Sequence, residues 1–400
     1  MIDFEPTETQ NMIVETAREF GREVMQPAER KLDLIADPQK AYSSEIFKDV
    51  WAKAYELGFH KMSLPQQYGG LELDAQTTGM VWEELGRWGP GFSAGLVSCA
   101  TVPRLISFLA PNNQELIDKF VIPFCEDTKG EHVSGWCSSE PDVGSDGKRY
   151  FDTKIRHRTT ATRNKDGWVI NGTKSGFVSN GGIASVHLVV ACVDPSMGLR
   201  GSGAFLVPAD LPGVSTGKPL DKIGLRVLNQ SEVFFDDVQI PESSLLFPHG
   251  EGYPMLHNSI ITVGNLGVGY LSVGLMRAAY EDALLHSRER VQGGKPIFEH
   301  QLIAKKLFGV YSAIESARAF LWKGSWLSKT SFPGDLKTSL AARIYASEEA
   351  IRHTAEMVQV FGGYGISREY TVEKYARDAK LLRIMDGTNE SLMIKAAELL

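Results

Sequence analysis

Apolar residues recur at helical spacing through residues 1–128. Thr7 and Ser44 each precede a segment whose apolar residues fall on one helical face, and a third such segment runs from Thr77 to Arg87. The apolar positions of the first two segments are Met12, Ile13, Ala17, Phe20, Phe47, Val50, Trp51 and Tyr55. Residues 1–128 are therefore predicted to form an N-terminal α-helical domain.

Near residue 130 the pattern changes to short apolar runs of strand length. These runs are residues 186–193, 204–207 and 231–241. Asp166-Gly167 and Asn171-Gly172 are typical turn dipeptides on either side of a fourth run. Short strands joined by such turns predict a central antiparallel β-barrel or sandwich over residues 129–242.

Helical spacing returns after residue 243, in segments 265–290, 298–328, 336–361 and 373–382. Long helices with short links predict a C-terminal four-helix bundle over residues 243–400, and hence a multidomain α+β fold. The uncharged stretch from Ser259 to Met276 is barely long enough to span a membrane, and it contains four glycines. We expect it to be a buried helix that packs closely on its neighbours, and no membrane span.

Composition excludes several functions. A net charge of −7 argues against nucleic-acid binding. The four cysteines are scattered and the nine histidines lack metal-ligand spacing, so no metal site is predicted. The segment from Met1 to Pro6 has no basic, then apolar, leader, and we expect a cytoplasmic protein.

Two segments near the C-terminus carry candidate chemistry. Residues 359–365 are rich in glycine, and residues 383–390 place Asp386 and Gly387 directly before the hydroxyl of Thr388. A carboxylate on such a bend can act as a base. Thr388 and the first N–H groups of the next helix can hold a polar or anionic cofactor group.

Four further segments, in order, complete a recognisable set: residues 136–146, close to the pattern TEPxxGSD, and residues 174–182, 235–241 and 289–297. With these segments the chain resembles the acyl-CoA dehydrogenase family over essentially its full length. The resemblance implies FAD as cofactor, an acyl-CoA thioester as substrate, an electron-transfer flavoprotein as electron acceptor, and a homotetramer.

The resemblance also implies which residues contact the flavin. A flavin needs hydrogen bonds at the polar edge of its ring and cover over its face. Ser139 is expected near the pyrimidine edge, Ser179 near the reactive N5 and Phe177 against the ring. Arg290 would bind the diphosphate of a flavin held by a neighbouring subunit. The full predicted cofactor set is Trp136, Ser138, Ser139, Ser145, Phe177, Val178, Ser179, Arg290, Gln292, Gln301, Gln359, Gly362, Gly363, Thr388 and Glu390.

Asp386 matches the glutamate that, in many relatives, removes the proton α to the thioester carbonyl while hydride leaves the β carbon for flavin N5. The backbone N–H of the base residue helps to polarise the carbonyl. Aspartate is one methylene shorter, and a displacement of about 1 Å at a reacting centre can cost on the order of a hundredfold in rate. Some relatives place the base on the preceding long helix, where this chain has Gly264.

The predicted substrate pocket also departs from the family pattern. Its residues are Phe92, Ser145, Asn265, Gly293, Met385 and Gly387. Asn265 replaces a usual arginine, Gly293 a usual phenylalanine, and Glu390 a usual glutamine. These changes favour a bulky, branched or cyclic acyl group. Phe92 stands where glutaryl-specific relatives carry arginine, which argues against a dicarboxylyl substrate, although Arg87 and Arg104 lie nearby in the sequence and leave this question open.

Two other functions remain open. A flavin oxidase resembling nitroalkane oxidase would also use an aspartate at the position of Asp386, and it would react with oxygen without CoA. A non-catalytic acyl-CoA-binding subunit would explain the altered pocket residues. Peroxide formation with nitroethane distinguishes the first of these, and flavin that no substrate reduces distinguishes the second.

Overall fold

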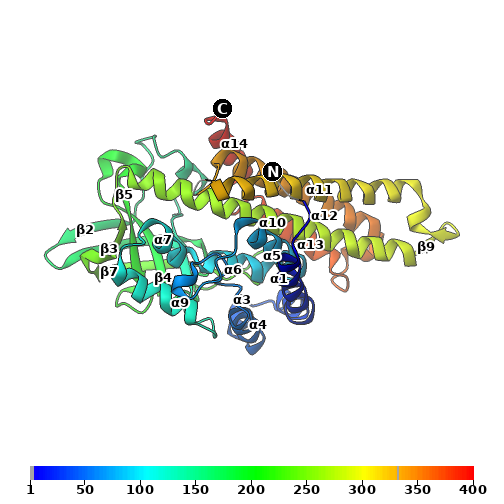
Figure 1. Cartoon of the computed structure of the whole chain (residues 1–400), viewed down its shortest axis with the longest axis horizontal. Coiled ribbons are helices and arrows are strands. Elements are labelled where there is room, and N and C mark those ends of the chain that lie inside the picture. Colours follow the sequence, from blue (N-terminus) through cyan, green and yellow to red (C-terminus); the bar gives the residue numbers. More distant parts are fainter. Residues whose placement is uncertain (1–3, 331–332) are drawn as a thin grey trace.

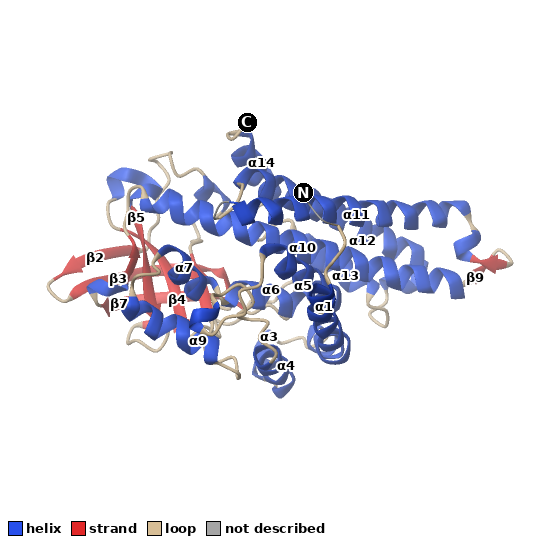
Figure 2. Ribbon diagram, viewed as in Figure 1, coloured by secondary structure: helices blue, strands red, loops and turns tan. Residues whose placement is uncertain are grey.

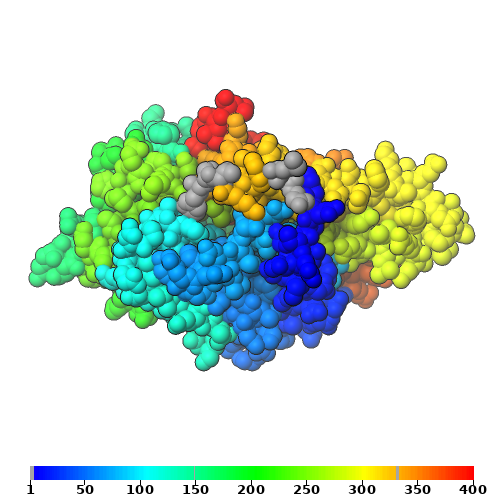
Figure 3. Space-filling view, in the orientation of Figure 1, coloured from blue at the N-terminus to red at the C-terminus, as the bar shows by residue number. Residues whose placement is uncertain are grey.

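The structure is a computed structural model that describes residues 4–330 and 333–400, so Met1 to Asp3 of the expected leaderless segment lie outside the described residues. Figure 1 shows an elongated molecule with a β-sheet at one end, a long helical bundle at the other, and N-terminal helices against the middle. In the space-filling view the far end of the bundle, near residue 300, extends beyond the N-terminal helices (Figure 3).

The N-terminal part is helical, as predicted. Its α-helices are α1 (Glu8–Phe20), α2 (Gln26–Asp33), α3 (Pro38–Ser43), α4 (Glu45–Glu56), α5 (Ala75–Trp88), α6 (Pro90–Cys99), α7 (Thr101–Leu109), α8 (Gln114–Leu116) and α9 (Ile122–Glu126). Thr7 begins α1 with a capping box in which its hydroxyl and the Gln10 side chain each accept from the other's backbone N–H. The Ser44 hydroxyl caps α4 in the same position by accepting from Phe47 N–H.

The central part is a β domain. Its strands are β1 (Ser134–Cys137), β2 (Thr160–Asn164), β3 (Gly167–Ser179), β4 (Val186–Cys192), β5 (Ser202–Pro208), β6 (Val214–Thr216), β7 (Gln230–Ile240) and β8 (Leu245–Phe247). The order across the sheet is β6-β7-β3-β2-β4-β5-β8, with β1 added on β4. The domain is predominantly antiparallel, but β1 and β2 each pair with β4 in parallel. Figure 2 shows this sheet as the compact red region.

One predicted turn of the β domain is wrong. Asp166-Gly167 does lie at the hairpin between β2 and β3, but Asn171-Gly172 lies inside β3. The ladder with β7 is irregular there. Asn171 exchanges hydrogen bonds of 2.9 and 2.8 Å with Asp237 of β7. Gly172 has a φ of 144°, and a Cβ atom there would lie 2.6 Å from Thr159 Cα, so only glycine fits this position. The dipeptide forms a bulge instead of a turn.

The C-terminal part is a helical bundle, as predicted, and among the described residues it has three long helices and two short ones. They are α10 (Gly252–Glu289), α11 (Gln301–Thr330), α12 (Leu336–Phe361), α13 (Val372–Leu382) and α14 (Asn389–Ala397), with a small ribbon of β9 (Val291–Gln292) and β10 (Lys295–Pro296) after α10. These three regions, in this order, confirm the predicted fold class.

The glycines of α10 let it pack closely, as expected. A Cβ atom on Gly274 would lie only 2.2 Å from the Glu83 carbonyl oxygen of α5. Two segments, 90–109 and 252–289, are long and apolar enough to cross a membrane, but 72% and 83% of their most apolar windows are buried inside the protein. Burial of this extent is what the core helices of a globular fold show.

Candidate active site

Asp386 lies on a tight turn between α13 and α14, with its side chain exposed. Its φ of 56° is left-handed, a conformation that aspartate tolerates better than most residues, and Gly387 follows with a φ of 107°. Arg343 of α12, which is 0% exposed, holds this turn. Its Nη2 atom donates to the carbonyl oxygens of Leu382 at 2.9 Å and Met385 at 2.7 Å. The carboxylate of Asp386 is thus presented by a turn that the bundle fixes from behind.

The space beside the Asp386 carboxylate is open. A Cβ atom on Gly264 of α10 would lie 3.3 Å from Asp386 Oδ2 and within 4 Å of no other atom of the described residues outside its own helix backbone and chain neighbours. Asn265, one residue on, is turned back to its own helix, where Nδ2 donates to the Ile261 carbonyl at 2.7 Å. Asn265 therefore brings no charge to the carboxylate.

Two arginines among the described residues feel the charge of the Asp386 carboxylate. Burial lowers the pKa of the Arg104 guanidinium in α7 and of Arg343, and the negative charge of Asp386 opposes the shift at both. Arg87, the other arginine left open by the sequence, is bound instead to Glu281 at 2.6 Å and Asp282 at 3.5 Å. Of the two arginines that the sequence left open, Arg104 is the one within electrostatic reach of Asp386.

The β domain meets this turn through Ser145 and Thr388. The backbone N–H of Thr388 donates to Ser145 Oγ at 3.2 Å. The Thr388 hydroxyl caps α14 by accepting from Ser391 N–H at 3.4 Å. Glu390 points to Arg383, with which it forms an ion pair of 2.8 Å. Ser145, Asp386 and Thr388, predicted from distant segments, are therefore brought together.

A second cluster lies on the sheet. Side chains alternate along a strand, so Phe177 and Ser179 of β3 share one face while Val178 turns into the core. Phe177 is 68% exposed, an unusual environment for phenylalanine. An exposed aromatic ring beside a hydroxyl is the combination that a flat heteroaromatic ring with polar edges requires. Phe177 and Ser179 therefore fit a flavin.

The predicted residues of the first strand lie next to β3. Trp136 is in β1, and Ser138 and Ser139 follow its end. Ser139 is tied to β3 because its carbonyl accepts from Ser175 N–H at 3.0 Å. Behind them, the buried Lys174 Nζ donates to Glu140 Oε1 at 2.6 Å, and this pair anchors the loop that carries both serines.

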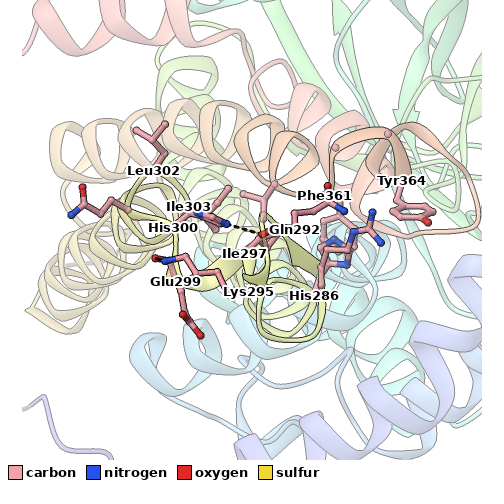
Figure 4. Close-up of a pocket in the computed structure, with 15 residues that line it drawn as sticks. His286, Gln292, Lys295, Ile297, Glu299, His300, Leu302, Ile303, Phe361 and Tyr364 are labelled. Atoms are coloured by element: carbon pink, nitrogen blue, oxygen red, sulfur yellow. Dashed lines mark hydrogen bonds between the residues drawn. The ribbon is translucent and has the colours of Figure 1, made fainter.

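A third cluster forms a pocket of about 1080 Å³ at the far end of the bundle. Figure 4 shows His286, Phe361 and Tyr364 at one side and Glu299 and Leu302 at the other. The predicted residues that line it are Arg290, Gln292, Gln301, Gly362 and Gly363. The Arg290 guanidinium lies 5.2 Å from the centre of the Tyr364 ring.

The glycines of this pocket suit close backbone approach. Among the described residues, and apart from each glycine, its chain neighbours and its own helix backbone, no atom lies within 4 Å of a Cβ position on Gly362 or Gly363, so the backbone there is open to a ligand. Gln359, also predicted for this site, is exposed and is not among the residues that line the pocket.

The far pocket is remote from Asp386 within one chain. Gly264 lies in the first half of the continuous helix α10, and Arg290 is the residue that directly follows its end. At about 1.5 Å per residue, this separation is about 39 Å. Gly293, predicted for the substrate pocket, sits in the turn after that helix beside His300, so the structure does not bring it to Asp386 of the same chain.

Two other residues predicted for the substrate pocket are buried or partly buried. Phe92 is 1% exposed and packs on Phe47 with ring centres 5.4 Å apart, so it belongs to the N-terminal core. Met385 is partly buried against the bundle core, although its neighbour Asp386 is exposed.

Arg343 was not predicted as a site residue from the sequence. The signal for it was present, since a helical period through Leu340 and Ile344 directs Arg343 toward the core.

Three domain families match the sequence in order. "Acyl-CoA dehydrogenase, N-terminal domain" matches residues 7–116, "Acyl-CoA dehydrogenase, middle domain" residues 135–238, and "Acyl-CoA dehydrogenase, C-terminal domain" residues 250–400.

Named proteins are similar over almost the whole chain. A short-chain-specific acyl-CoA dehydrogenase of Megasphaera elsdenii is 32% identical and covers 100% of both chains. A cyclohexane-1-carbonyl-CoA dehydrogenase of Geobacter metallireducens is 31% identical over 97% of this chain and 96% of its own. The structure of butyryl-CoA dehydrogenase from Megasphaera elsdenii is 30% identical, covers 99% of both chains and superposes with a TM-score of 0.88.

Proposed function

The chain belongs to the acyl-CoA dehydrogenase family, and from that membership we propose that Asp386 is the base that removes the α proton of an acyl-CoA thioester. The protein is an FAD-dependent acyl-CoA dehydrogenase. FAD, when bound, would supply the hydride acceptor for the β hydrogen, and loss of the two hydrogens would give an enoyl-CoA.

The observation that carries this proposal is the exposed carboxylate beside open space. Asp386 faces the vacant side of Gly264, and Arg343 holds its turn. A base must be fixed to within a fraction of an ångström, and a buried arginine bound to the turn provides such a constraint. Among the described residues, nothing accepts a hydrogen bond from the N–H of Asp386. That donor is free to polarise a thioester carbonyl.

The remaining residues would bind and orient the cofactor. Phe177 would cover the ring, and the hydroxyl of Ser179 would meet its reactive edge. Arg290 would bind a diphosphate through two aligned charged hydrogen bonds. An FAD molecule is shorter than the separation of about 39 Å between Gly264 and Arg290. Arg290 would therefore serve the flavin of a second subunit, and we propose a homotetramer as the assembly.

The substrate that we propose has a bulky, branched or cyclic acyl group. The open space at Gly264 supports it, as does similarity to a relative named for a cyclohexane-carbonyl thioester. A relative named for short chains is equally similar, so the acyl group must be identified by experiment. We also propose an electron-transfer flavoprotein as electron acceptor, as family membership suggests, and the cytoplasm as location.

The test is bleaching of the bound flavin under anaerobic conditions. Butyryl-CoA, isobutyryl-CoA and cyclohexanecarbonyl-CoA are added separately, and the visible spectrum is followed. We expect Asp386→Asn to slow bleaching by about 10²- to 10⁴-fold, the usual contribution of a general base. Asp237→Asn is the matched control, because Asp237 is also an exposed, left-handed aspartate.

Other outcomes would redirect the function. Peroxide formed from nitroethane and oxygen, without bleaching by any thioester, would favour the oxidase. A bound flavin that neither thioesters nor nitroethane reduce would favour the non-catalytic subunit. Unchanged bleaching in Asp386→Asn would remove Asp386 as the base.

A further inference from the structure

Gln230 joins a buried cation to the two residues proposed to face the flavin ring. It is the first residue of β7, pairs with Ser179 at the end of β3, and is 8% exposed. Its Nε2 atom lies 3.3 Å from the Phe177 carbonyl oxygen and 3.3 Å from Ser179 Oγ. Its Oε1 atom lies 3.1 Å from Lys222 Nζ. All polar atoms of the amide are thus engaged.

Lys222 determines which way round the Gln230 amide lies. Burial lowers the pKa of Lys222 to about 7, so at pH 6 its side chain is mainly an ammonium group. An ammonium group has hydrogens to donate and nothing to accept with, so the amide oxygen must face Lys222 Nζ. Lys222 Nζ also donates to the Leu228 carbonyl, which fixes its position. With the oxygen on that side, the amide NH₂ must face Phe177 and Ser179.

This arrangement decides the direction of the Ser179 hydroxyl hydrogen. One amide hydrogen of Gln230 occupies a lone pair of Ser179 Oγ, so the hydroxyl hydrogen cannot point at Gln230. Phe177 and Ser179 lie on the same face of β3, and the exposure of Phe177 shows that this face is open. The hydroxyl hydrogen of Ser179 is therefore free to be donated outward, past the Phe177 ring.

We propose that Gln230 is a positioning residue that orients Ser179 as a hydrogen-bond donor toward an acceptor atom of the bound flavin. This inference rests on the proposed function, which places Ser179 near N5. The N5 atom of an oxidised flavin carries no hydrogen and can only accept. Because Gln230 already orients the Ser179 hydroxyl, little rotational entropy of that hydroxyl is lost when FAD binds.

Gln230→Glu tests the inference because it keeps size and shape but reverses the hydrogen bonding. A carboxylate still accepts from Lys222, but it can donate neither to Ser179 nor to the Phe177 carbonyl. The Ser179 hydroxyl would turn inward to donate to the carboxylate and would be lost to the flavin. Gln230→Met, of similar length, removes the hydrogen bonds but leaves the hydroxyl free to rotate outward.

The measurement is the dissociation constant of FAD, from flavin fluorescence on titration of the apoprotein at pH 6, with the thermal midpoint recorded for each variant. Ser179→Ala and Gln230→Glu should each weaken FAD binding by roughly fivefold, the value of one neutral hydrogen bond. The double variant should be no weaker than either. Gln230→Met should be milder than Gln230→Glu, and Gln239→Glu, an exposed glutamine on the same strand, should match wild type.

Two results would overturn the inference in different ways. If Ser179→Ala weakens FAD binding and Gln230→Glu does not, Gln230 does not position Ser179, and the proposed flavin site stands. If Ser179→Ala itself leaves FAD binding unchanged, the placement of Ser179 against the flavin is wrong, and the inference falls with it. A purely structural Gln230 would tolerate its isostere glutamate better than methionine, which is the opposite order from the one expected.

Discussion

Gly264 and Asp386 face the same open space from two different elements. A Cβ atom on Gly264 of α10 would lie 3.3 Å from Oδ2 of Asp386 on the turn before α14. The resemblance to the family implies a base at the position of Asp386 or, in some relatives, at that of Gly264. In this chain the two positions adjoin, so a carboxylate from either element can reach one substrate atom.

The base should therefore be transferable from the turn to the helix. We expect Asp386→Gly to slow flavin bleaching by about 10²- to 10⁴-fold, and the double variant Asp386→Gly with Gly264→Glu to recover part of that loss. The rate of anaerobic bleaching by the best thioester is the measurement. Gly264→Gln in the Asp386→Gly background is the control, since it has the same size without a base. Equal recovery with glutamine would show that filling space, and not proton removal, is responsible.

Much of the fold could be predicted because local signals agreed with the tertiary structure. The helix predicted at 336–361 matches α12 to the residue, and Thr7 and Ser44 begin α1 and α4 where their capping hydroxyls suggest. Asn171-Gly172 misled because a turn dipeptide and a bulge use the same backbone conformations. Only the neighbouring strand β7 decides between them.

The site was predictable only where it depends on short motifs. The motifs and their order along the chain predicted Asp386, Ser145 and Thr388 as site residues. The structure brings these three residues together. Phe92 packs in the core because its helix start is bound by buried Glu29, a contact between residues far apart in sequence. Arg343 and Gln230 stand outside the motifs, and their roles depend on partners that no local pattern reveals.

Arg343 should matter for both stability and chemistry. Arg343→Met would leave the Leu382 and Met385 carbonyls and the Asn389 amide without their buried donor. We expect a loss of about 2–4 kcal/mol in the free energy of unfolding, together with slower bleaching because the turn of Asp386 is released.

Urea unfolding and bleaching rates measure the two effects of Arg343→Met. Arg352→Met is the matched control on the same helix, because the Arg352 side chain is 70% exposed and its ion pair with Glu349 is long at 3.6 Å. Such a surface pair contributes about 0–1 kcal/mol. Loss of stability with an unchanged bleaching rate in the folded fraction would mean that Arg343 does not position Asp386.

Arg290 should contribute to cofactor binding without contributing to the fold. Its guanidinium lines the far pocket over Tyr364, where we place the diphosphate of a flavin from a second subunit. Arg290→Ala should weaken FAD binding by roughly 10- to 100-fold, the value of a charge-assisted hydrogen bond, and leave the thermal midpoint of the apoprotein unchanged. Arg288→Ala, two residues earlier and beside Phe298, should leave FAD binding unchanged. Equal effects of the two substitutions would indicate general electrostatics instead of a diphosphate site.

Asp127 should make stability depend on pH where the N-terminal helices join the β domain. It is buried, and it accepts backbone hydrogen bonds from Lys129 at 2.7 Å, Gly130 at 2.9 Å and His132 at 2.7 Å. Burial alone would raise the pKa of Asp127, but the hydrogen bonds from His132, Lys129 and Gly130 outweigh it and hold that pKa below its usual range.

The sign of the pH effect follows from that depressed pKa. The carboxylate stabilises the fold fully above the pKa of an unfolded aspartate, about 3.9, and this contribution is lost as the pH falls through the lower folded pKa. Asp127→Asn should therefore cost about 1–3 kcal/mol at pH 7, and the difference from wild type should shrink as the pH falls below about 4. Urea unfolding at several pH values measures it, with the exposed Asp118→Asn as control. A difference that stays constant down to pH 3 would show that the amide disturbs packing and that the charge of Asp127 is not the cause.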